Sequence, residues 1–346
     1  MPSTQDPNAL PWDPHNDIFP ARGELPHITH SEVEKVPEGA AWVWGYDDQL
    51  GRLNLLTPER VATAAREQIQ TGQSTRVDLP LDVPKHPSWQ REPFVHHVKV
   101  IVGEGGIGHD DTYSLNTQSG TQWDGFRHVS SGDTGLFYNG TTANDIQQST
   151  EPAGIHHWST KALAGRGILL DYCAYADSQG IKYDSASSHA ISYTDLVACG
   201  KHQGVDIRPA HQGGDIHPGD FLFVRSGFTQ DYFNRTDAEN EAIGNRSSPQ
   251  WAGVLQEPDM IDWLHDCYFA AVAGDAPAFE VWPTTQSYKL HEYLLPLWGC
   301  PIGEMLDLEG VAALCREHKR WTFFFCTAPA NCPGGVGSHV NGSAIF

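Results

Sequence analysis

"GRGILLDY" (Gly165–Tyr172) is a short, strongly apolar run bounded by turn-forming residues. The chain holds three more runs of this form: "PGDFLFVRSG" (Pro218–Gly227), "YFAAVAGD" (Tyr268–Asp275) and "RWTFFFCTA" (Arg320–Ala328). A strand that is covered on both faces is apolar along its whole length, whereas a half-exposed strand alternates apolar and polar residues. These four runs therefore predict central, buried strands of one sheet.

Helix candidates lie between these runs, so strands and helices alternate along the chain. The clearest helix begins after Thr57, which can cap it, with Pro58 at the first helical position and Gly72 where a helix would stop. The other candidates are near Gly154–Leu163, Ser192–Gly200, Pro258–Asp266 and Leu308–His318. Ser74–Val83 and His96–Gly103 are rich in β-branched residues and predict further strands. The alternation predicts the α/β class, with a mixed, largely buried sheet flanked by helices.

The chain divides into an arm and one domain. Residues 1–40 are rich in proline and polar residues without a periodic apolar pattern, which predicts an extended arm. Residues 41–346 show no internal repeat and no linker, and we expect a single domain there. Because the arm cannot form a core, Leu10, Trp12 and Phe19 should bury on this subunit or a neighbour. A homodimer or homotetramer is expected on this basis.

The charge balance excludes several classes of partner. With 22 Lys and Arg against 43 Asp and Glu, the formal net charge is −21, which repels nucleic-acid phosphates and anionic lipids. No apolar run has the length of a membrane span, no signal-peptide pattern begins the chain, and the seven cysteines contain no CxxC pair. We therefore expect a cytoplasmic protein with a small-molecule substrate, and neither a nucleic-acid nor a membrane partner.

The segment "SLNTQSGTQWDGFRHVSSG" (Ser114–Gly132) carries the candidate chemistry. If it is extended as far as Asp124, the side chains of Gln118, Gln122 and Asp124 share one face and Trp123 takes the other. If the chain then turns helical at Gly125, Asp124 and His128 become i and i+4 neighbours about 6 Å apart and can converge on a metal ion. The alternative is that Asp124 caps the turn and His128 makes a local hydrogen bond. Spacing alone leaves both interpretations open.

This segment resembles the signature of the cyclase family of metal-dependent hydrolases, H-x-G-T-H-x-D-x-P-x-H, which bacterial kynurenine formamidases and isatin hydrolase share. The matching positions are Gly120, Thr121, Asp124 and His128. The differing positions replace two histidines and a proline, and they are Gln118, Gln122 and Phe126. Four further segments are similar to family segments in the same order: Trp44–Glu59, Gly165–Tyr172, Pro218–Gly227 and Ala273–Glu280. The resemblance covers nearly the whole chain after Ala40 and implies the family's swivelling β/α fold.

The resemblance also implies a metal site. The family's late His and Glu ligands correspond to His291 and Glu304, so one divalent ion would be held by Asp124, His291 and Glu304, with Gln122 as a further candidate ligand. His128 is either a further ligand or the base that moves a proton, with Asp124 as its catalytic partner. An amide oxygen suits manganese better than zinc, whereas imidazole suits zinc, so losing two histidines favours one ion (Mn or Zn) over two.

The implied activity is that of a metal-dependent hydrolase that cleaves a cyclic amide, imide or lactone, or an aryl formamide. Two alternatives stay open: a metal-dependent cyclase or dehydratase of secondary metabolism, and a binding protein that has lost the family's activity. The residues expected to contact the substrate are Trp123, Phe126, Gln118 and Tyr138. "HDD" (His109–Asp111) is either an acidic loop tip or a source of further carboxylates near the site.

The two glutamines generate a first prediction. Changing both Gln118→His and Gln122→His should raise zinc affinity and create a second metal position, because imidazole binds zinc far better than an amide does. Metal analysis and zinc titration of both proteins measure the effect, with about one ion per chain expected for the unmodified protein. Two tightly bound zinc ions in the unmodified protein would contradict the expectation of one ion per chain. Other residues such as His109 or Asp111 would then supply the missing ligands.

Overall fold

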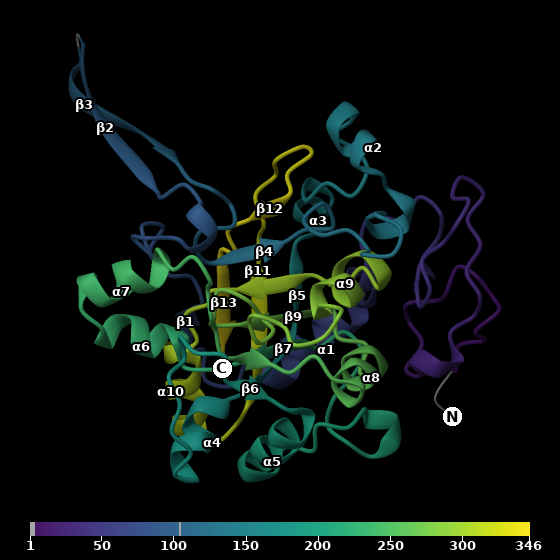
Figure 1. Ribbon diagram of the computed structural model, residues 1–346. Coiled ribbons are helices and arrows are strands. Elements are labelled where there is room, and N and C mark those ends of the chain that lie inside the picture. Colours follow the sequence, from purple (N-terminus) through teal and green to yellow (C-terminus); the bar gives the residue numbers. More distant parts are fainter. Residues whose placement is uncertain (1–3, 104) are drawn as a thin grey trace.

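A mixed sheet of nine strands forms the centre of the computed structural model, which describes residues 4–103 and 105–346 (Figure 1). Its strands are β1 (Ser74–Arg76), β4 (Gln122–Asp124), β5 (Leu163–Leu170), β7 (Phe221–Val224), β9 (Ala271–Gly274), β10 (Ile302–Glu304), β11 (Thr322–Thr327), β12 (Gly337–Ser338) and β13 (Gly342–Ile345). They lie in the order β1-β13-β11-β5-β7-β9-β10-β4-β12. The middle strands β5, β7, β9 and β10 are parallel, and the flanking pairs on both sides are antiparallel. The sheet is therefore mixed, as predicted.

The four apolar runs are strands of this sheet, which confirms the predicted fold class. They become β5, β7, β9 and β11, and every residue of β7 and β9 is buried. Strand β11 instead alternates buried and half-buried positions, because only one face of this antiparallel strand turns toward the core. Gly167 lets the aromatic residues approach, since a Cβ at this position would lie 2.5 Å from the Phe323 ring.

Helices cover the sheet (Figure 1). The predicted ones are present as α1 (Pro58–Gln68), α3 (His156–Lys161), α5 (Tyr193–Gln203), α8 (Pro258–Asp266) and α10 (Glu309–His318). Thr57 caps α1 by accepting a hydrogen bond from the backbone N–H of Arg60. The other helices are α2 (Ala143–Gln148), α4 (Tyr172–Ser178), α6 (Phe228–Asn234), α7 (Asp237–Gly244) and α9 (Leu290–Glu292). Within the described residues, no helix has both the length and the apolar character required to cross a membrane.

Short elements complete the chain. The single-turn helices are η1 (Arg22–Glu24), η2 (Gly51–Leu55), η3 (Ser88–Gln90), η4 (Tyr138–Gly140), η5 (Ala210–Gln212) and η6 (Tyr293–Leu297). Strands β6 (Ala190–Ile191) and β8 (Gly253–Val254) form a small parallel pair apart from the central sheet. These elements are shorter than any sequence periodicity can identify.

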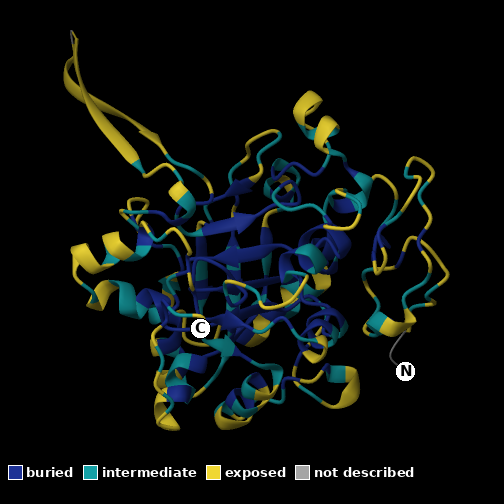
Figure 2. Cartoon of the chain, viewed as in Figure 1, coloured by how far each residue is buried: buried dark blue, intermediate teal, exposed yellow. Residues whose placement is uncertain are grey.

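Strands β2 (Val95–Gly103) and β3 (Gly106–Ser114) form a separate antiparallel ribbon that projects from the body (Figure 1). All eighteen residues of the two strands are exposed, and the ribbon is correspondingly yellow in Figure 2. His109–Asp111 lies within β3, where Asp111 pairs with His96 at 2.8 Å. The expectation of an acidic loop tip was therefore wrong, because these residues belong to a paired strand.

The described part of the N-terminal arm packs against its own chain; residues 1–3 lie outside the described part. Trp12 and Phe19 are buried, and the Phe19 ring stacks on that of Tyr268 at a centroid distance of 4.7 Å. The backbone N–H of Trp12 donates to the carbonyl of Val43 at 2.8 Å. Leu10, by contrast, is exposed. The arm was expected to bury its apolar residues either on this subunit or on a neighbour. Trp12 and Phe19 are buried on this subunit, so they give no argument for a partner subunit.

Trp12→Ala should destabilise the protein, because Trp12 is 3% exposed and the change leaves a cavity among aromatic rings. A loss of about 3–5 kcal/mol in the free energy of unfolding is expected. Leu10→Ala is the matched control: Leu10 is 44% exposed, and its change should cost less than about 0.5 kcal/mol. Urea denaturation of both variants measures the difference. Equal stabilities would contradict the packing of the arm on this subunit.

Candidate metal centre

The pairing of β4 with β10 places the signature residues beside Glu304. In this antiparallel register Gln122 lies opposite Glu304, and Asp124 lies opposite Ile302. Side chains alternate along the strand, so Gln122 and Asp124 share one face. Trp123 takes the other face, where its indole N–H donates to the Thr327 hydroxyl at 3.1 Å. The short strand thus sorts its polar and apolar side chains as its sequence predicts.

A turn after β4 brings His128 back toward Asp124. The backbone N–H of His128 donates to the carbonyl of Gly125 at 3.0 Å, and no helix follows. Glycine is required at position 125, because a Cβ would lie 2.4 Å from the carbonyl oxygen of Val336. The Nε2 atom of His128 lies 3.8 Å from Asp124 Oδ2. The two side chains therefore converge as predicted, but through a turn and not through the helix that was expected after Gly125.

His291 and Glu304 complete a buried cluster with Asp124. The Nε2 atom of His291, on α9, lies 3.6 Å from Asp124 Oδ2 and 3.2 Å from Glu304 Oε1. One donor atom from each of these three residues lies within 4.8 Å of the other two. All three residues are buried. Tertiary folding thus brings together side chains that are about 180 positions apart in the sequence, in the spacing that one metal ion needs.

Glu280 orients His291, and sequence reasoning did not identify it. Its Oε1 atom accepts hydrogen bonds from His291 Nδ1 at 2.6 Å and from the backbone N–H of His291 at 3.0 Å. Its Oε2 atom accepts from Gln256 Nε2 at 2.6 Å. Glu280 thereby holds Nδ1, and Nε2 faces the carboxylates of Asp124 and Glu304, as in metal sites where a carboxylate supports a histidine ligand. The only sequence signal was its place at the end of the segment Ala273–Glu280.

Gln122 faces the cluster with its nitrogen. Its Nε2 atom donates to Gln118 Oε1 at 2.9 Å, to Glu304 Oε2 at 2.9 Å and to Asp124 Oδ1 at 3.3 Å. Ionised carboxylates only accept hydrogen bonds, so they select this orientation of the amide. The prediction that Gln122 offers an oxygen ligand is therefore not met by this geometry. Gln122 instead holds both carboxylates in place, and Gln118 supports it.

Burial and mutual charge interactions shift the pKa values of the three ionisable side chains in the cluster. Burial would raise the pKa of Asp124, but the imidazoles of His128 and His291 hold it below its ordinary value. Burial and the charge of Asp124 raise the pKa of Glu304. Burial would lower the pKa of His291, yet the carboxylates around it raise this pKa well above its ordinary value. Because metal ligands bind in their deprotonated forms, binding of a divalent cation here would release a proton from this group.

The donor set fits a divalent ion. Asp124 Oδ2 is buried and has no hydrogen-bond partner, although it lies between the imidazoles of His128 and His291. An unpaired buried carboxylate oxygen is costly, and a metal ion would satisfy it. Two carboxylates with one imidazole are ligands that zinc and manganese both accept. Asp124, His291 and Glu304 are therefore the residues that would hold the ion, with His128 next to them.

A second group of possible ligands lies at Glu151, His156 and His157. Its imidazole Nε2 atoms lie 3.8 and 4.0 Å from Glu151 Oε2, but the Glu151 side chain is 74% exposed, unlike the three buried residues of the cluster. The group also lies outside the segments that resemble the family signature. The buried cluster is therefore the better candidate for a catalytic centre.

Three of the residues expected to contact a substrate belong to the core. Trp123, Phe126 and Tyr138 are all buried, and the rings of Phe126 and Tyr138 pack against each other at a centroid distance of 4.7 Å. The Tyr138 hydroxyl donates to Asp48 at 2.8 Å. These predictions were wrong because aromatic side chains fill the space between the signature turn and the body. Gln118 alone of the four reaches the cluster, through Gln122.

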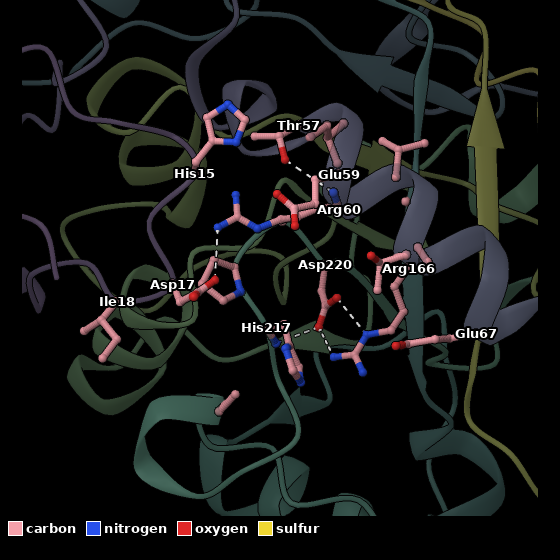
Figure 3. A pocket seen from close by; sticks show the side chains of 18 of the residues that line it. His15, Asp17, Ile18, Thr57, Glu59, Arg60, Glu67, Arg166, His217 and Asp220 are labelled. Carbon is pink, nitrogen blue, oxygen red and sulfur yellow. Dashed lines mark hydrogen bonds and ion pairs between the residues drawn. The ribbon is translucent and has the colours of Figure 1, made fainter. Parts of the chain in front are cut away.

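A cavity of about 680 Å³ lies elsewhere, beside α1, the arm, Gly165 and Arg166 of β5, and the segment 217–220 that precedes β7 (Figure 3). Arg166 lines it and is paired with Asp220 at 2.6 Å. Arg60 donates to backbone carbonyls of the arm. The buried cluster instead lies where β9 and β10 end, and ligands of open α/β sheets bind at the carboxyl ends of parallel strands. Geometry and chemistry therefore favour the cluster over this cavity as the reactive site.

Comparison with known proteins identifies one family model and several solved structures that resemble this chain. The sequence model of the putative cyclase family matches residues 76–281, more than half of the chain. The chain is similar to the crystal structure of a novel cyclase, with 28% identity, a TM-score of 0.74, and coverage of 88% of this chain and 98% of that one. It is also similar to isatin hydrolase A from Ralstonia solanacearum (16% identity, TM-score 0.54, coverage 84% and 97%). No curated protein matches the chain.

Asp124→Ala should abolish metal binding and leave the fold intact, because it removes the carboxylate that faces both imidazoles. Glu280→Gln should weaken metal affinity about 10- to 100-fold, because His291 loses its supporting carboxylate. Elemental analysis and metal titration, with circular dichroism as the control for folding, measure both effects. Full metal occupancy in folded Asp124→Ala would exclude this cluster as the metal site.

Proposed function

The chain belongs to the putative cyclase family, and on that premise we propose that it is a metal-dependent hydrolase. Its substrate would be a cyclic amide, imide or lactone, or an aryl formamide. The observation that carries the proposal is the buried, unpartnered Oδ2 atom of Asp124, which faces the Nε2 atoms of His128 and His291. A carboxylate oxygen buried among imidazoles, without a hydrogen-bond donor, is the arrangement expected of a metal ligand.

One divalent ion, manganese or zinc, would be held by Asp124, His291 and Glu304. When bound, such an ion supplies Lewis-acid polarisation of a carbonyl group and lowers the pKa of water toward neutrality. Gln118 and Gln122 do not add imidazoles, and the Gln122 nitrogen donates to the two carboxylates that would serve as ligands. Three strong ligands and an inward-facing amide nitrogen favour one ion rather than two.

His128 is the proposed proton shuttle. Its side chain is 22% exposed, whereas Asp124 is fully buried, so His128 lies between the cluster and the solvent. Its neighbour Arg127 donates to the carbonyls of Pro152, Ser149 and Gly334, which fixes the turn that carries the imidazole. A histidine held at the edge of the site can take a proton from a nucleophilic water and deliver it to the leaving nitrogen or oxygen.

Ring formation is the second candidate function, and the family description favours it. A cyclase or dehydratase would use the same residues on a substrate that carries both reacting groups. The direction of the reaction separates the two: hydrolysis consumes water and opens or cleaves the substrate, whereas cyclisation releases water. Mass spectrometry of the products distinguishes them by the gain or loss of one water.

The proposal is tested by a screen of lactones, cyclic imides and formyl anilides, with added manganese or zinc. The unmodified protein should hydrolyse one of these classes, and metal removal should abolish the activity. His128→Asn should lower kcat about 10²- to 10⁴-fold, because the shuttle is lost, while the metal content stays unchanged.

His202→Asn, on α5, serves as the control and should keep full activity. Loss of the metal in His128→Asn would instead assign His128 as a ligand. Full activity of His128→Asn would overturn its role as the shuttle.

A further inference from the structure

The cavity beside α1 is enclosed by three segments of the chain (Figure 3). Its walls are one face of α1, residues 15–18 of the N-terminal arm, and the segment 217–220 together with Gly165 and Arg166 of β5. The volume of about 680 Å³ is in the range of small-molecule sites. The cavity shares no lining residue with the cluster of Asp124, His291 and Glu304. It is therefore a separate candidate for ligand binding.

The two arginines that line this cavity are already bound within the protein. Arg166 donates to both carboxylate oxygens of Asp220, at 2.9 and 2.6 Å, and to the carbonyl of Asp215 at 2.6 Å. Arg60 donates to the carbonyl of Leu55 at 3.1 Å and to two carbonyls of the arm. An anionic ligand would have to compete with these acceptors for the guanidinium groups. The arginines therefore do not make the cavity an anion site.

Carboxylates outnumber guanidinium groups around the cavity. The ionised lining residues are four acids and two bases: Asp17, Glu59, Glu67 and Asp220 with Arg60 and Arg166. Asp17 lies 3.9 Å from Arg60. Glu59 and Glu67 are exposed, and neither carboxylate has a hydrogen bond or an ion pair within the described part of the chain. This excess of negative charge raises the local concentration of cations and favours a cationic ligand.

The two unpaired carboxylates lie at opposite ends of one wall. Glu59 is in the first turn of α1 and Glu67 is in the last, eight positions later, which separates them by about 12 Å along the helix axis. Ala64 lines the cavity between them, and Leu56 and Ile18 add apolar surface. A ligand that reaches both carboxylates across this surface needs a cationic group at each end and an aliphatic chain between them.

We propose that this cavity binds a linear aliphatic diamine or polyamine with an ammonium group at each end. The two ammonium groups pair with Glu59 and Glu67, which Figure 3 shows among the lining side chains. The methylene chain lies along the apolar side chains of the cavity, as the stems of long cationic side chains do on protein surfaces. The site goes beyond the proposed hydrolase function, because it needs neither the metal nor its ligands.

The arm closes one side of this site, so binding and arm docking are coupled. Arg60 holds the arm against α1 by donating to the backbone carbonyls of Pro14 and Asn16. His15 and Asp17, which flank Asn16, line the cavity. A ligand that contacts both α1 and the arm binds the folded chain with its arm in place, and it should raise the melting temperature.

Isothermal titration calorimetry of the full chain with spermidine tests the site. When extended, spermidine separates its terminal ammonium groups by about the length of α1 between Glu59 and Glu67. One equivalent per chain should bind, and the affinity should fall as sodium chloride is added, because salt screens the ion pairs. Putrescine, a shorter diamine, should bind more weakly because it cannot reach both carboxylates, and inorganic phosphate should not bind.

Two charge-removing variants locate the binding. Glu59→Gln and Glu67→Gln should each weaken spermidine binding about two- to fivefold, and the double variant about tenfold, because each removes one partly exposed ion pair. Both positions are exposed, so circular dichroism should show an unchanged fold. The matched control is Glu241→Gln on α7, which removes the same charge from an exposed position outside the cavity lining and should leave the affinity unchanged.

The inference is overturned if spermidine does not bind, or if it binds as several equivalents that the two cavity variants do not affect. Equal weakening by Glu241→Gln would show that the overall negative charge attracts the polyamine, and no particular cavity. Binding of inorganic phosphate in place of spermidine would assign the cavity to anions instead. None of these measurements depends on the bound metal or on catalysis, so a failure here leaves the proposed hydrolase function standing.

Discussion

The antiparallel pairing of β4 with β10 is the constraint on which the site depends. It places Gln122 opposite Glu304, so that residues 182 positions apart share one hydrogen bond of 2.9 Å. Because strand side chains alternate, the same pairing puts Asp124 on the cluster side and sends Trp123 into the core. A slip by one residue would exchange these faces and bury the indole against His291 in place of a carboxylate. Register therefore decides whether a metal centre exists.

Around this pairing, the chain holds buried negative charge that its own residues do not fully neutralise. Glu280 uses its acceptor positions on His291 and Gln256, while Asp124 Oδ2 has no donor. Burying such a group costs free energy unless a cation satisfies it. Gln118 and Gln122 stand where the family signature has two histidines. The Gln122 amide nitrogen donates hydrogen bonds to the carboxylates of Asp124 and Glu304, and a donating nitrogen is not a metal ligand.

The N-terminal arm and the β2–β3 ribbon differ in how far their apolar side chains are covered. The aromatic residues of the N-terminal arm are covered by their own subunit, so they leave no apolar surface for a neighbour. The ribbon is the opposite case, since its valines are uncovered and its base is hydrogen-bonded to the segment that holds Gln118.

The sequence by itself determined the α/β class, the strands β5, β7, β9 and β11, and the helix after Thr57. These follow from local apolar runs and capping residues, which need no knowledge of distant contacts. Its resemblance to the family pointed to Asp124, His291 and Glu304 as metal ligands, and that assignment stays a prediction. Tertiary structure alone decided that Glu280 supports His291, that the Gln122 nitrogen faces the carboxylates, and that Phe126 and Tyr138 are core residues. Each of these depends on which segments meet in space, and neither residue type nor spacing encodes that meeting.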